Sequence, residues 1–230
     1  MERVEHLDYG LKIYQNSELY TFTSDAVLLA KFAKVKNGET IADLGSGSGI
    51  ISLYLAKKAD VKKIYAVEIQ KKLAEMSKKS VELNNLQNKI EIINENMLNL
   101  SLQVDVVVTN PPYKKFSSIK NENSSRAIAR HEIEINLTKL LKTASKMLKE
   151  KGRFYICYDS NRTAELIYNL KLNKLEPKKM FFTYANINKN ASIVFVEAVK
   201  CGKEEIKILP PIITNNENGK YIENLEIKDV

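Results

Sequence analysis

Short apolar runs and longer amphipathic stretches alternate along the chain from residue 40 to residue 172. The runs "TIADL", "KIYAV", "KIEIIN" and "VDVVVTN" are rich in β-branched residues, which is typical of strands buried in a sheet. The stretches between them, such as "QKKLAEMSKKSVELNN", repeat apolar residues at helical spacing. This alternation predicts a mainly parallel sheet with helices on both faces. The expected strands are 40–44, 63–67, 89–94, 104–110 and 153–158, and the expected helices are 50–59, 70–85, 133–150 and 161–172.

Two further apolar runs, 178–184 and 192–199, follow one another with no helical stretch between them. Strands joined in this way pair antiparallel, so these two complete a sheet of seven strands. Gly152 stands between the last long amphipathic stretch and the fifth strand, and we expect it to end that helix. The predicted fold class is α/β, with a Rossmann-like, mostly parallel sheet and an antiparallel C-terminal strand pair.

We expect a single domain, because 230 residues suit one core and no segment rich in glycine or proline divides the chain. Residues 1–36 differ in pattern from the rest. They begin with an aromatic-rich hairpin or irregular cover and continue into a helix, for which Thr23 or Ser24 suits the N-cap and Asp25 the first turn. Residues 37–200 form the predicted core, and residues 201–230 form a peripheral tail.

The chain is basic, with 36 lysine and arginine residues against 28 acidic residues and a net charge of +8. This charge favours a polyanionic partner such as nucleic acid, although lysine-rich solvated faces give the same balance. The sequence shows no signal peptide and no apolar run of membrane length, so we expect a soluble, cytoplasmic protein. Cys157 and Cys201 have no neighbours at metal-binding spacing, so neither a disulfide framework nor a metal site is expected.

A glycine-rich turn separates the first core strand from the helix that follows it. The segment "IADLGSGSGI" places Gly45, Gly47 and Gly49 there, where glycine permits a tight turn and lets a ligand approach the N–H groups of the helix N-terminus. Glu68 ends the next strand about 20 residues after Gly49, and a carboxylate at this distance accepts the ribose hydroxyls of an adenosine. The pattern predicts a site for a nucleoside cofactor.

The spacing of this turn identifies the kind of cofactor. A dinucleotide pyrophosphate needs G-x-G-x-x-G, whereas the turn reads G-x-G-x-G and follows Asp43, an acid that suits a cationic or amino-bearing ligand. S-adenosyl-L-methionine carries both a sulfonium and an α-amino group. The segment "DLGSGSG" resembles the motif of class I methyltransferases, and the resemblance extends over residues 40–199. It implies that S-adenosyl-L-methionine is the cofactor.

The fourth core strand ends in a polar, rigid corner, "NPPY", from Asn110 to Tyr113. In an open parallel sheet this end of a strand lies beside the ligand. An amine on a base, or a side-chain amide, is a poor nucleophile because its lone pair is delocalised. The Asn110 side-chain oxygen and the Pro111 carbonyl offer acceptors for its two hydrogens, which leaves the lone pair free, while Pro112 keeps the corner rigid. The Tyr113 ring offers a face on which a base stacks.

This corner resembles the (D/N/S)PP(Y/F) signature of amino-methyltransferases. With "ELYTFTSDAVLLAKFA" and "ARHEIEINLTKLLKTASKMLKEKGRFYICY", it resembles the bacterial tRNA adenine-N6 methyltransferases that modify a valine tRNA beside the anticodon. The resemblance implies that Thr23 and Asp25 lie over the cofactor. Asn96 departs from it, since many relatives have an aspartate there, beside the adenine. The expected cofactor site comprises Thr23, Asp25, Asp43, Gly45, Ser46, Gly47, Gly49, Glu68, Ile69, Asn96, Met97 and Asn110.

The expected reaction is methylation of the N6 amine of an adenine in tRNA by a monomeric enzyme. The same acceptors also fit the amide of a protein glutamine, or an adenine N6 or guanine N2 amine in rRNA or DNA, so these substrates stay open. A non-catalytic RNA-binding module is a further alternative, which the intact glycine turn, Glu68 and "NPPY" oppose. The expected substrate-binding residues are Tyr113, Lys114, Arg126 and Arg130, with the two arginines as phosphate contacts.

Overall fold

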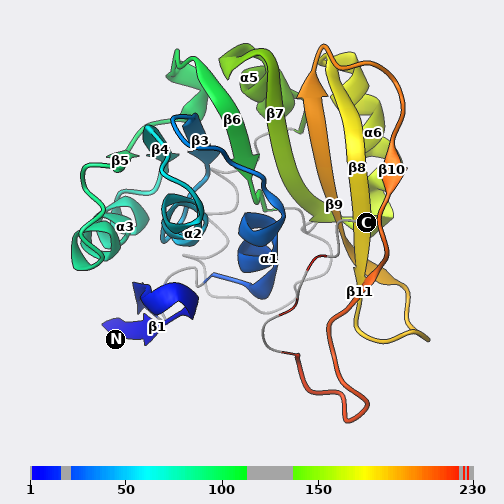
Figure 1. Cartoon of the computed structure of the whole chain (residues 1–230), viewed down its shortest axis with the longest axis horizontal. Helices are drawn as coiled ribbons and strands as arrows, with labels where there is room; N and C mark the ends of the chain where they lie inside the picture. The colour runs from blue at the N-terminus through cyan, green and yellow to red at the C-terminus, as the bar shows by residue number, and fades with distance from the viewer. Residues whose placement is uncertain (1, 17–21, 113–136, 223–224, 226, 228–230) are drawn as a thin grey trace.

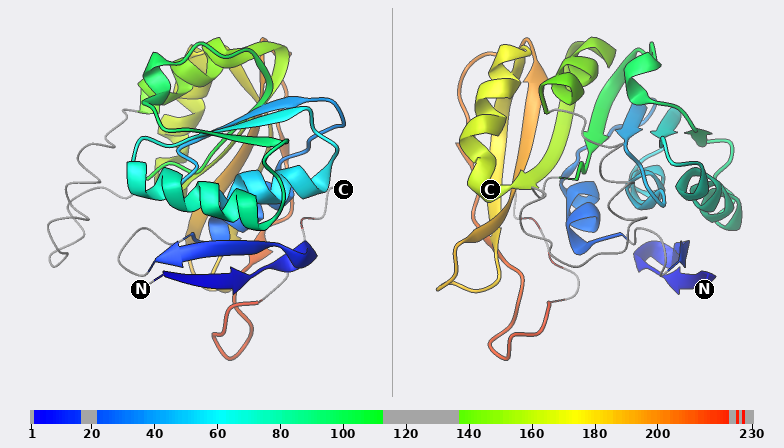
Figure 2. Two further views of the ribbon diagram at one scale, coloured as in Figure 1. Left: turned by 90° about the vertical axis from the view of Figure 1, so that its left-hand side faces the viewer. Right: turned by 180° about the vertical axis from the view of Figure 1, so that it is seen from behind.

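The computed structural model describes residues 2–16, 22–112, 137–222, 225 and 227 (Figure 1). A twisted sheet runs through the protein with helices on both of its faces, and a separate short hairpin lies near the N-terminus (Figures 1 and 2). The strands are β1 (Glu2–His6), β2 (Lys12–Asn16), β3 (Thr40–Leu44), β4 (Lys63–Val67), β5 (Ile90–Ile93), β6 (Val104–Thr109), β7 (Leu148–Asp159), β8 (Leu175–Tyr184), β9 (Ala191–Lys200), β10 (Lys207–Ile208) and β11 (Ile212–Ile213). The α-helices are α1 (Ser24–Phe32), α2 (Ile50–Lys58), α3 (Lys71–Leu83), α5 (Leu137–Met147) and α6 (Thr163–Leu172), and the 3-10 turns are η1 (Asp8–Gly10), η2 (Met97–Asn99) and η4 (Ser160–Arg162).

The large sheet has the strand order β10-β8-β9-β7-β6-β3-β4-β5, and β11 also pairs with β8. The five neighbouring strands β7, β6, β3, β4 and β5 are parallel, whereas β9 is antiparallel to both β7 and β8. The predicted α/β class, the mostly parallel sheet and the antiparallel C-terminal pair are therefore confirmed. Two strands were not predicted: β10 and β11, of two residues each, come from the segment 201–230 and pair with β8 in parallel.

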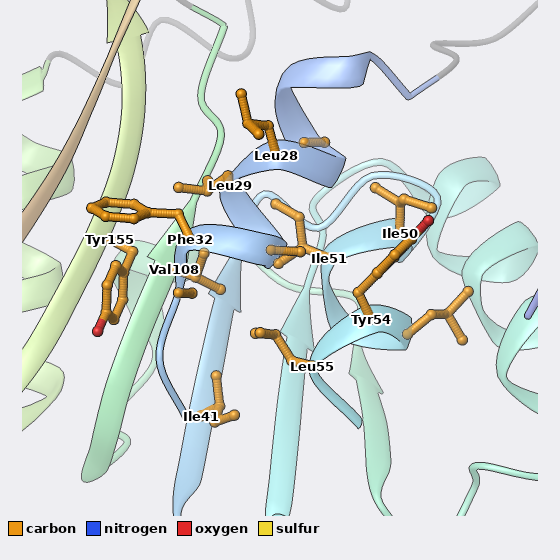
Figure 3. Close-up of a cluster of buried hydrophobic side chains, with 14 of the residues drawn as sticks. Leu28, Leu29, Phe32, Ile41, Ile50, Ile51, Tyr54, Leu55, Val108 and Tyr155 are labelled. Atoms are coloured by element: carbon orange, nitrogen blue, oxygen red, sulfur yellow. The ribbon is translucent and has the colours of Figure 1, made fainter. Parts of the chain in front are cut away.

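The alternation of side chains along the central strands divides the core into two layers. Val106 and Val108 lie in the cluster that contains α1 and α2, whereas Val107 lies in the cluster that contains α5 and α6. On the first face, Phe32 of α1 meets the ring of Tyr155 edge to face, with 5.6 Å between the ring centroids (Figure 3). Burial on both faces explains why these strands read as continuous apolar runs.

The N-terminal segment is a hairpin, one of the two forms that its sequence left open. Strands β1 and β2 pair antiparallel and form a sheet of their own. The hairpin is attached to α3, because the Tyr14 N–H donates to Ser80 Oγ at 3.0 Å and the Lys12 N–H donates to Asn84 Oδ1 at 2.9 Å.

The prediction that Gly152 ends the helix after residue 133 is wrong. Residues 133–136 lie outside the described residues, and α5 ends at Met147, because Leu148 already pairs with Val104 as the first residue of β7. A register shift follows in the β6–β7 pairing, and Gly152 lies within β7. A Cβ at Gly152 would come within 2.9 Å of the Lys149 carbonyl oxygen, so glycine serves close backbone packing there.

Candidate active site

The three central strands end at the same level, and each is followed by residues that the sequence assigns to the site. Leu44 at the end of β3 pairs with Val67 of β4 and with Thr109 of β6. The Thr109 hydroxyl also donates to the Leu44 carbonyl at 2.8 Å, which joins the ends of β3 and β6. The structure therefore brings the glycine turn, Glu68 and Asn110 to one edge of the sheet, where open α/β sheets bind their ligands.

The glycine turn needs glycine for two separate reasons. Gly45, Gly47 and Gly49 have φ angles of +72°, +55° and +86°, a backbone conformation that other residues rarely adopt. A Cβ at Gly49 would also lie 2.3 Å from Ser77 Oγ on α3, so any larger residue here would also require that buried hydroxyl to move. The Gly45 N–H donates to the Val67 carbonyl at 2.9 Å, which holds the turn against the end of β4.

Asp43 is a buried carboxylate with one oxygen satisfied. Its Oδ2 accepts hydrogen bonds from Ser52 of α2, at 2.7 Å from the hydroxyl and 3.2 Å from the backbone N–H. Its Oδ1 is buried and has no hydrogen-bond partner among the described residues. Burial raises the pKa of Asp43 to about 7, against the effect of the two hydrogen bonds from Ser52. A cation or N–H donor at Oδ1 would favour the charged form.

Glu68 links the end of β4 to the glycine turn. Its side chain is buried, and its two oxygens accept from the backbone N–H groups of Gly47 at 2.8 Å and of Gln70 at 2.9 Å. Burial raises the pKa of Glu68, and these hydrogen bonds oppose the shift. A carboxylate oxygen can accept more than one hydrogen bond, so the predicted contact with ribose hydroxyls is compatible with this geometry.

The predicted residues after β4 and β5 differ in exposure, and Met97 lies close to the turn. Ile69 is exposed, whereas Met97 is buried and its Cε lies 4.0 Å from a Cβ built at Gly45. Asn96 caps η2, with its side-chain oxygen accepting from the Leu98 N–H at 3.0 Å. The sequence did not point to Asn94, which donates to the Glu68 carbonyl at 2.8 Å and so joins the ends of β4 and β5.

The N-terminus of α1 reaches the same edge of the sheet. Thr23 is the N-cap of α1 through its carbonyl, which accepts from the Ala26 N–H at 3.0 Å, and its side chain makes no capping bond. Thr23 Oγ1 is buried without a hydrogen-bond partner in the described part of the chain. Burial raises the pKa of the Cys157 thiol on β7, and the negative charge of Asp25 adds to this shift. The side chain of Asp25 is therefore near that thiol.

In the corner after β6, the side chain of Asn110 makes a hydrogen bond to β7. Asn110 is half-buried, and its Oδ1 lies 3.0 Å from the Cys157 Sγ, which donates the hydrogen bond. Pro111 is half-buried and Pro112 is exposed. Four further predicted residues, Tyr113, Lys114, Arg126 and Arg130, lie outside the described residues.

The structure adds partners that the sequence did not indicate. Ser52 lies nine residues after Asp43, in the first turn of α2, and a hydroxyl at such a helix start was a weak available signal. Cys157 lies within an apolar strand, where a small buried thiol gives no signal of a polar contact. Both contacts depend on how separate elements pack.

A comparison with protein families decides the class of this site. The family described as "Methyltransferase small domain" matches residues 23–185. The chain belongs to this family. The methyltransferase is 30% identical over 200 residues to the tRNA1(Val) (adenine(37)-N6)-methyltransferase of Bacteroides thetaiotaomicron, with 80% of each chain covered. Similar proteins from Haemophilus influenzae and Bacteroides fragilis carry the same name.

Solved structures share the fold of this methyltransferase. A protein of Agrobacterium tumefaciens described as a predicted O-methyltransferase superposes with a TM-score of 0.67 at 18% identity, covering 86% of this chain and 91% of that one. The M. jannaschii protein TYW2 in complex with AdoMet superposes with a TM-score of 0.59 at 16% identity, covering 86% and 85%. The Rossmann-like fold and the methyltransferase class are therefore confirmed. The AdoMet bound to TYW2 is S-adenosyl-L-methionine, the cofactor that the sequence predicts for this chain.

The methyltransferase has buried polar atoms that suit this cofactor. Asp43 Oδ1, Ser46 Oγ and Thr23 Oγ1 are buried, and within the described ranges none has a hydrogen-bond partner. Buried polar atoms are normally paired, and these three lie in or beside elements that meet at the carboxyl edge of the sheet. A ligand that carries an amino group, a carboxylate and ribose hydroxyls offers partners for all of them.

Proposed function

We propose that this methyltransferase transfers a methyl group from S-adenosyl-L-methionine to the N6 amine of an adenine in tRNA. The observation that carries the proposal is the position of Asn110 and Pro111 at the end of β6, level with the glycine turn at the end of β3. This arrangement supports a role for Asn110 Oδ1 and the Pro111 carbonyl as amine acceptors beside the proposed cofactor site. The names of the curated relatives support adenine N6 as the target and tRNA as the polymer.

On the cofactor side, two buried carboxylates hold the ends of the ligand. Asp43 Oδ1 accepts from the α-amino group, and the positive charge keeps Asp43 ionised. Glu68 accepts from the ribose hydroxyls, while the N–H groups of Gly47 and Gln70 hold its carboxylate in place. The rest of the proposed cofactor site is formed by Thr23, Asp25, Gly45, Ser46, Gly49, Ile69, Asn96 and Met97, and Asn110 stands at its border with the substrate amine.

On the amine side, Asn110 and Pro111 supply acceptors, and the proposed transfer requires no charged base. When bound, S-adenosyl-L-methionine supplies an electrophilic methyl group. Asn110 Oδ1 and the Pro111 carbonyl accept the two N6 hydrogens, which disfavours delocalisation of the lone pair into the ring and directs it at the methyl group. The surplus proton leaves the nitrogen after transfer. Pro112 fixes the corner, and Tyr113 stacks on the adenine, which must leave its own stack to enter.

The polymer is held mainly through its phosphates. A net charge of +8 favours a polyanion, and we place Lys114, Arg126 and Arg130 at the phosphates. Among the described residues, no helix is both long and apolar enough to span a membrane. We propose a monomer that meets tRNA in the cytoplasm. Sedimentation of the free protein at increasing concentration tests the monomer, since a dimer would raise the sedimentation coefficient.

The test is methyl transfer from labelled S-adenosyl-L-methionine to unmodified total tRNA, followed by mass spectrometry of the nucleosides. We expect N6-methyladenosine as the labelled product. Asn110→Ala, purified in the same way, guards against a contaminating methyltransferase of the expression host. Label in rRNA, in DNA or on a protein glutamine, with none in tRNA, would agree with a methyltransferase but would overturn tRNA as the proposed substrate.

A further inference from the structure

We propose that Cys157 is a positioning residue for methyl transfer: its thiol holds the Asn110 amide so that the oxygen, and not the NH2 group, serves the substrate amine. This inference rests on the proposed function and adds a residue to it. Cys157 does not touch the reacting atoms. It acts through Asn110.

The strand geometry brings the two side chains together. Thr109 of β6 pairs with Ile156 of β7, so Asn110 and Cys157 follow at the next position of the parallel ladder. Side chains alternate along a strand, which places Asn110 on the face of Val108 and Cys157 on the face of Tyr155. Val108, Tyr155 and Cys157 lie in the cluster that α1 covers, and Sγ and Oδ1 approach to 3.0 Å.

The surroundings keep the thiol in its donor form. Cys157 is fully buried in an apolar layer, and the Asp25 carboxylate lies near it. Both burial and the negative charge raise the pKa of the thiol well above its usual value, so it stays protonated at neutral pH. A protonated thiol is a donor, and Asn110 Oδ1 is its acceptor.

The orientation matters because the two ends of an asparagine amide have nearly the same shape. With Oδ1 toward the substrate, the amide accepts a hydrogen from N6. After a flip of the amide, its NH2 group would face the NH2 group of the substrate, two donors would oppose each other, and the lone pair would stay delocalised. An amide oxygen has two acceptor positions, so Oδ1 can take one hydrogen from Cys157 and one from the substrate. The thiol therefore selects the productive orientation before the adenine arrives.

The test compares three variants of the full chain in single-turnover methyl transfer. Cys157→Ala removes the donor, and we expect its rate to fall about tenfold while the Kd for S-adenosylhomocysteine stays within about twofold. Cys157→Ser restores a donor and should recover part of the rate. Val106→Ala is the matched control, because Val106 is fully buried in the same cluster but lies four residues before Asn110. The rate of this variant should be unchanged. Equal rates for Cys157→Ala and the native enzyme would overturn the inference.

A second readout needs no substrate and separates this inference from the proposed function. The side-chain amide signal of Asn110 is identified in a nitrogen-15 spectrum by its loss in Asn110→Ala. It should shift in Cys157→Ala, and stay in place in Val106→Ala. An unmoved signal would overturn the inference even if tRNA is the substrate. If another amine proves to be the substrate, the same rate ratios are measured on that amine, and the spectrum still decides. Should Cys157→Ala fail to fold, Cys157→Val, which fills the buried site without a donor, supplies the comparison: a shifted Asn110 signal supports the contact, and an unmoved one overturns it.

Discussion

The two sides of the active site are held in different ways. At the ends of β3 and β4, charged side chains accept from neighbouring donors: Asp43 from Ser52, and Glu68 from the N–H groups of Gly47 and Gln70. At the end of β6, the neutral Asn110 accepts from a thiol. The cofactor side thus depends on charge and on backbone conformation, whereas the amine side depends on the direction of one uncharged acceptor. Substitutions on the first side should change affinity and stability, and those on the second should change rate.

The largest effect should come from Asn110→Ala. It removes one of the two acceptors for the amine, and we expect the single-turnover rate to fall by about 10²- to 10³-fold, as when one preorganised group is removed from a transition-state site. The Kd for S-adenosylhomocysteine, measured by calorimetry, should stay within about twofold. A loss of affinity as large as the loss of rate would place Asn110 on the cofactor side and break the comparison.

Gly49→Ala tests the backbone of the cofactor side through stability. The new alanine would keep the φ of +86°, which is strained for it, and its Cβ would lie 2.3 Å from Ser77 Oγ. We therefore expect urea unfolding to show that the free energy of unfolding falls by about 2–3 kcal/mol. Gly38→Ala is the matched control, because Gly38 has a φ of +77° with open space around it, and strain alone should cost about 1 kcal/mol. Equal losses for the two variants would show that α3 gives way and that packing does not fix this turn.

The smallest expected effect is the pH dependence that the Asp43 carboxylate gives to folding stability and to cofactor affinity. Burial raises its pKa to about 7, so ionisation opposes folding of the free protein, and stability should fall as the pH rises from about 4 to about 7. Glu68, whose pKa burial also raises, acts in the same direction. Binding of the α-amino group needs the ionised carboxylate, so affinity should be about tenfold higher at pH 8 than at pH 6.

Calorimetry with S-adenosylhomocysteine at both pH values checks this expectation. Asp43→Asn should bind more weakly and should lose the dependence on pH, because its amide does not titrate in this range. An affinity of the native protein that is flat between pH 6 and pH 8 would contradict the assigned role of Asp43.

Those parts of the site that are contiguous in the sequence could be predicted from it. The strand, the three glycines and the helix start together specify a turn with positive φ angles, and the structure has them at Gly45, Gly47 and Gly49. The spacing to Glu68 also predicts its nearness to the turn, because a strand must end at the same edge of a parallel sheet. The roles of the individual residues in binding and catalysis stay predictions.

Contacts that depend on packing could not be predicted in this way. The pairing of Asn110 with Cys157 joins residues 47 positions apart through strand register, and the sequence of β7 gives no sign of it. The end of α5 was misjudged for a similar reason: the helical pattern continues to Leu148, but pairing with Val104 takes that residue into β7. Strands of two residues, such as β10 and β11, are too short to show any periodicity.

The segment after β9 also covers the edge of the large sheet at β8. β8 is the last long strand, and its outer backbone groups pair with β10 at Lys179 and Met180 and with β11 at Thr183 and Tyr184. An uncovered strand of this length is a template for pairing with another copy of the same chain, and that is how many folded proteins begin to aggregate. Shortening the chain after residue 200 would therefore uncover β8 and invite edge-to-edge association, so an expression strategy for this enzyme should keep that segment.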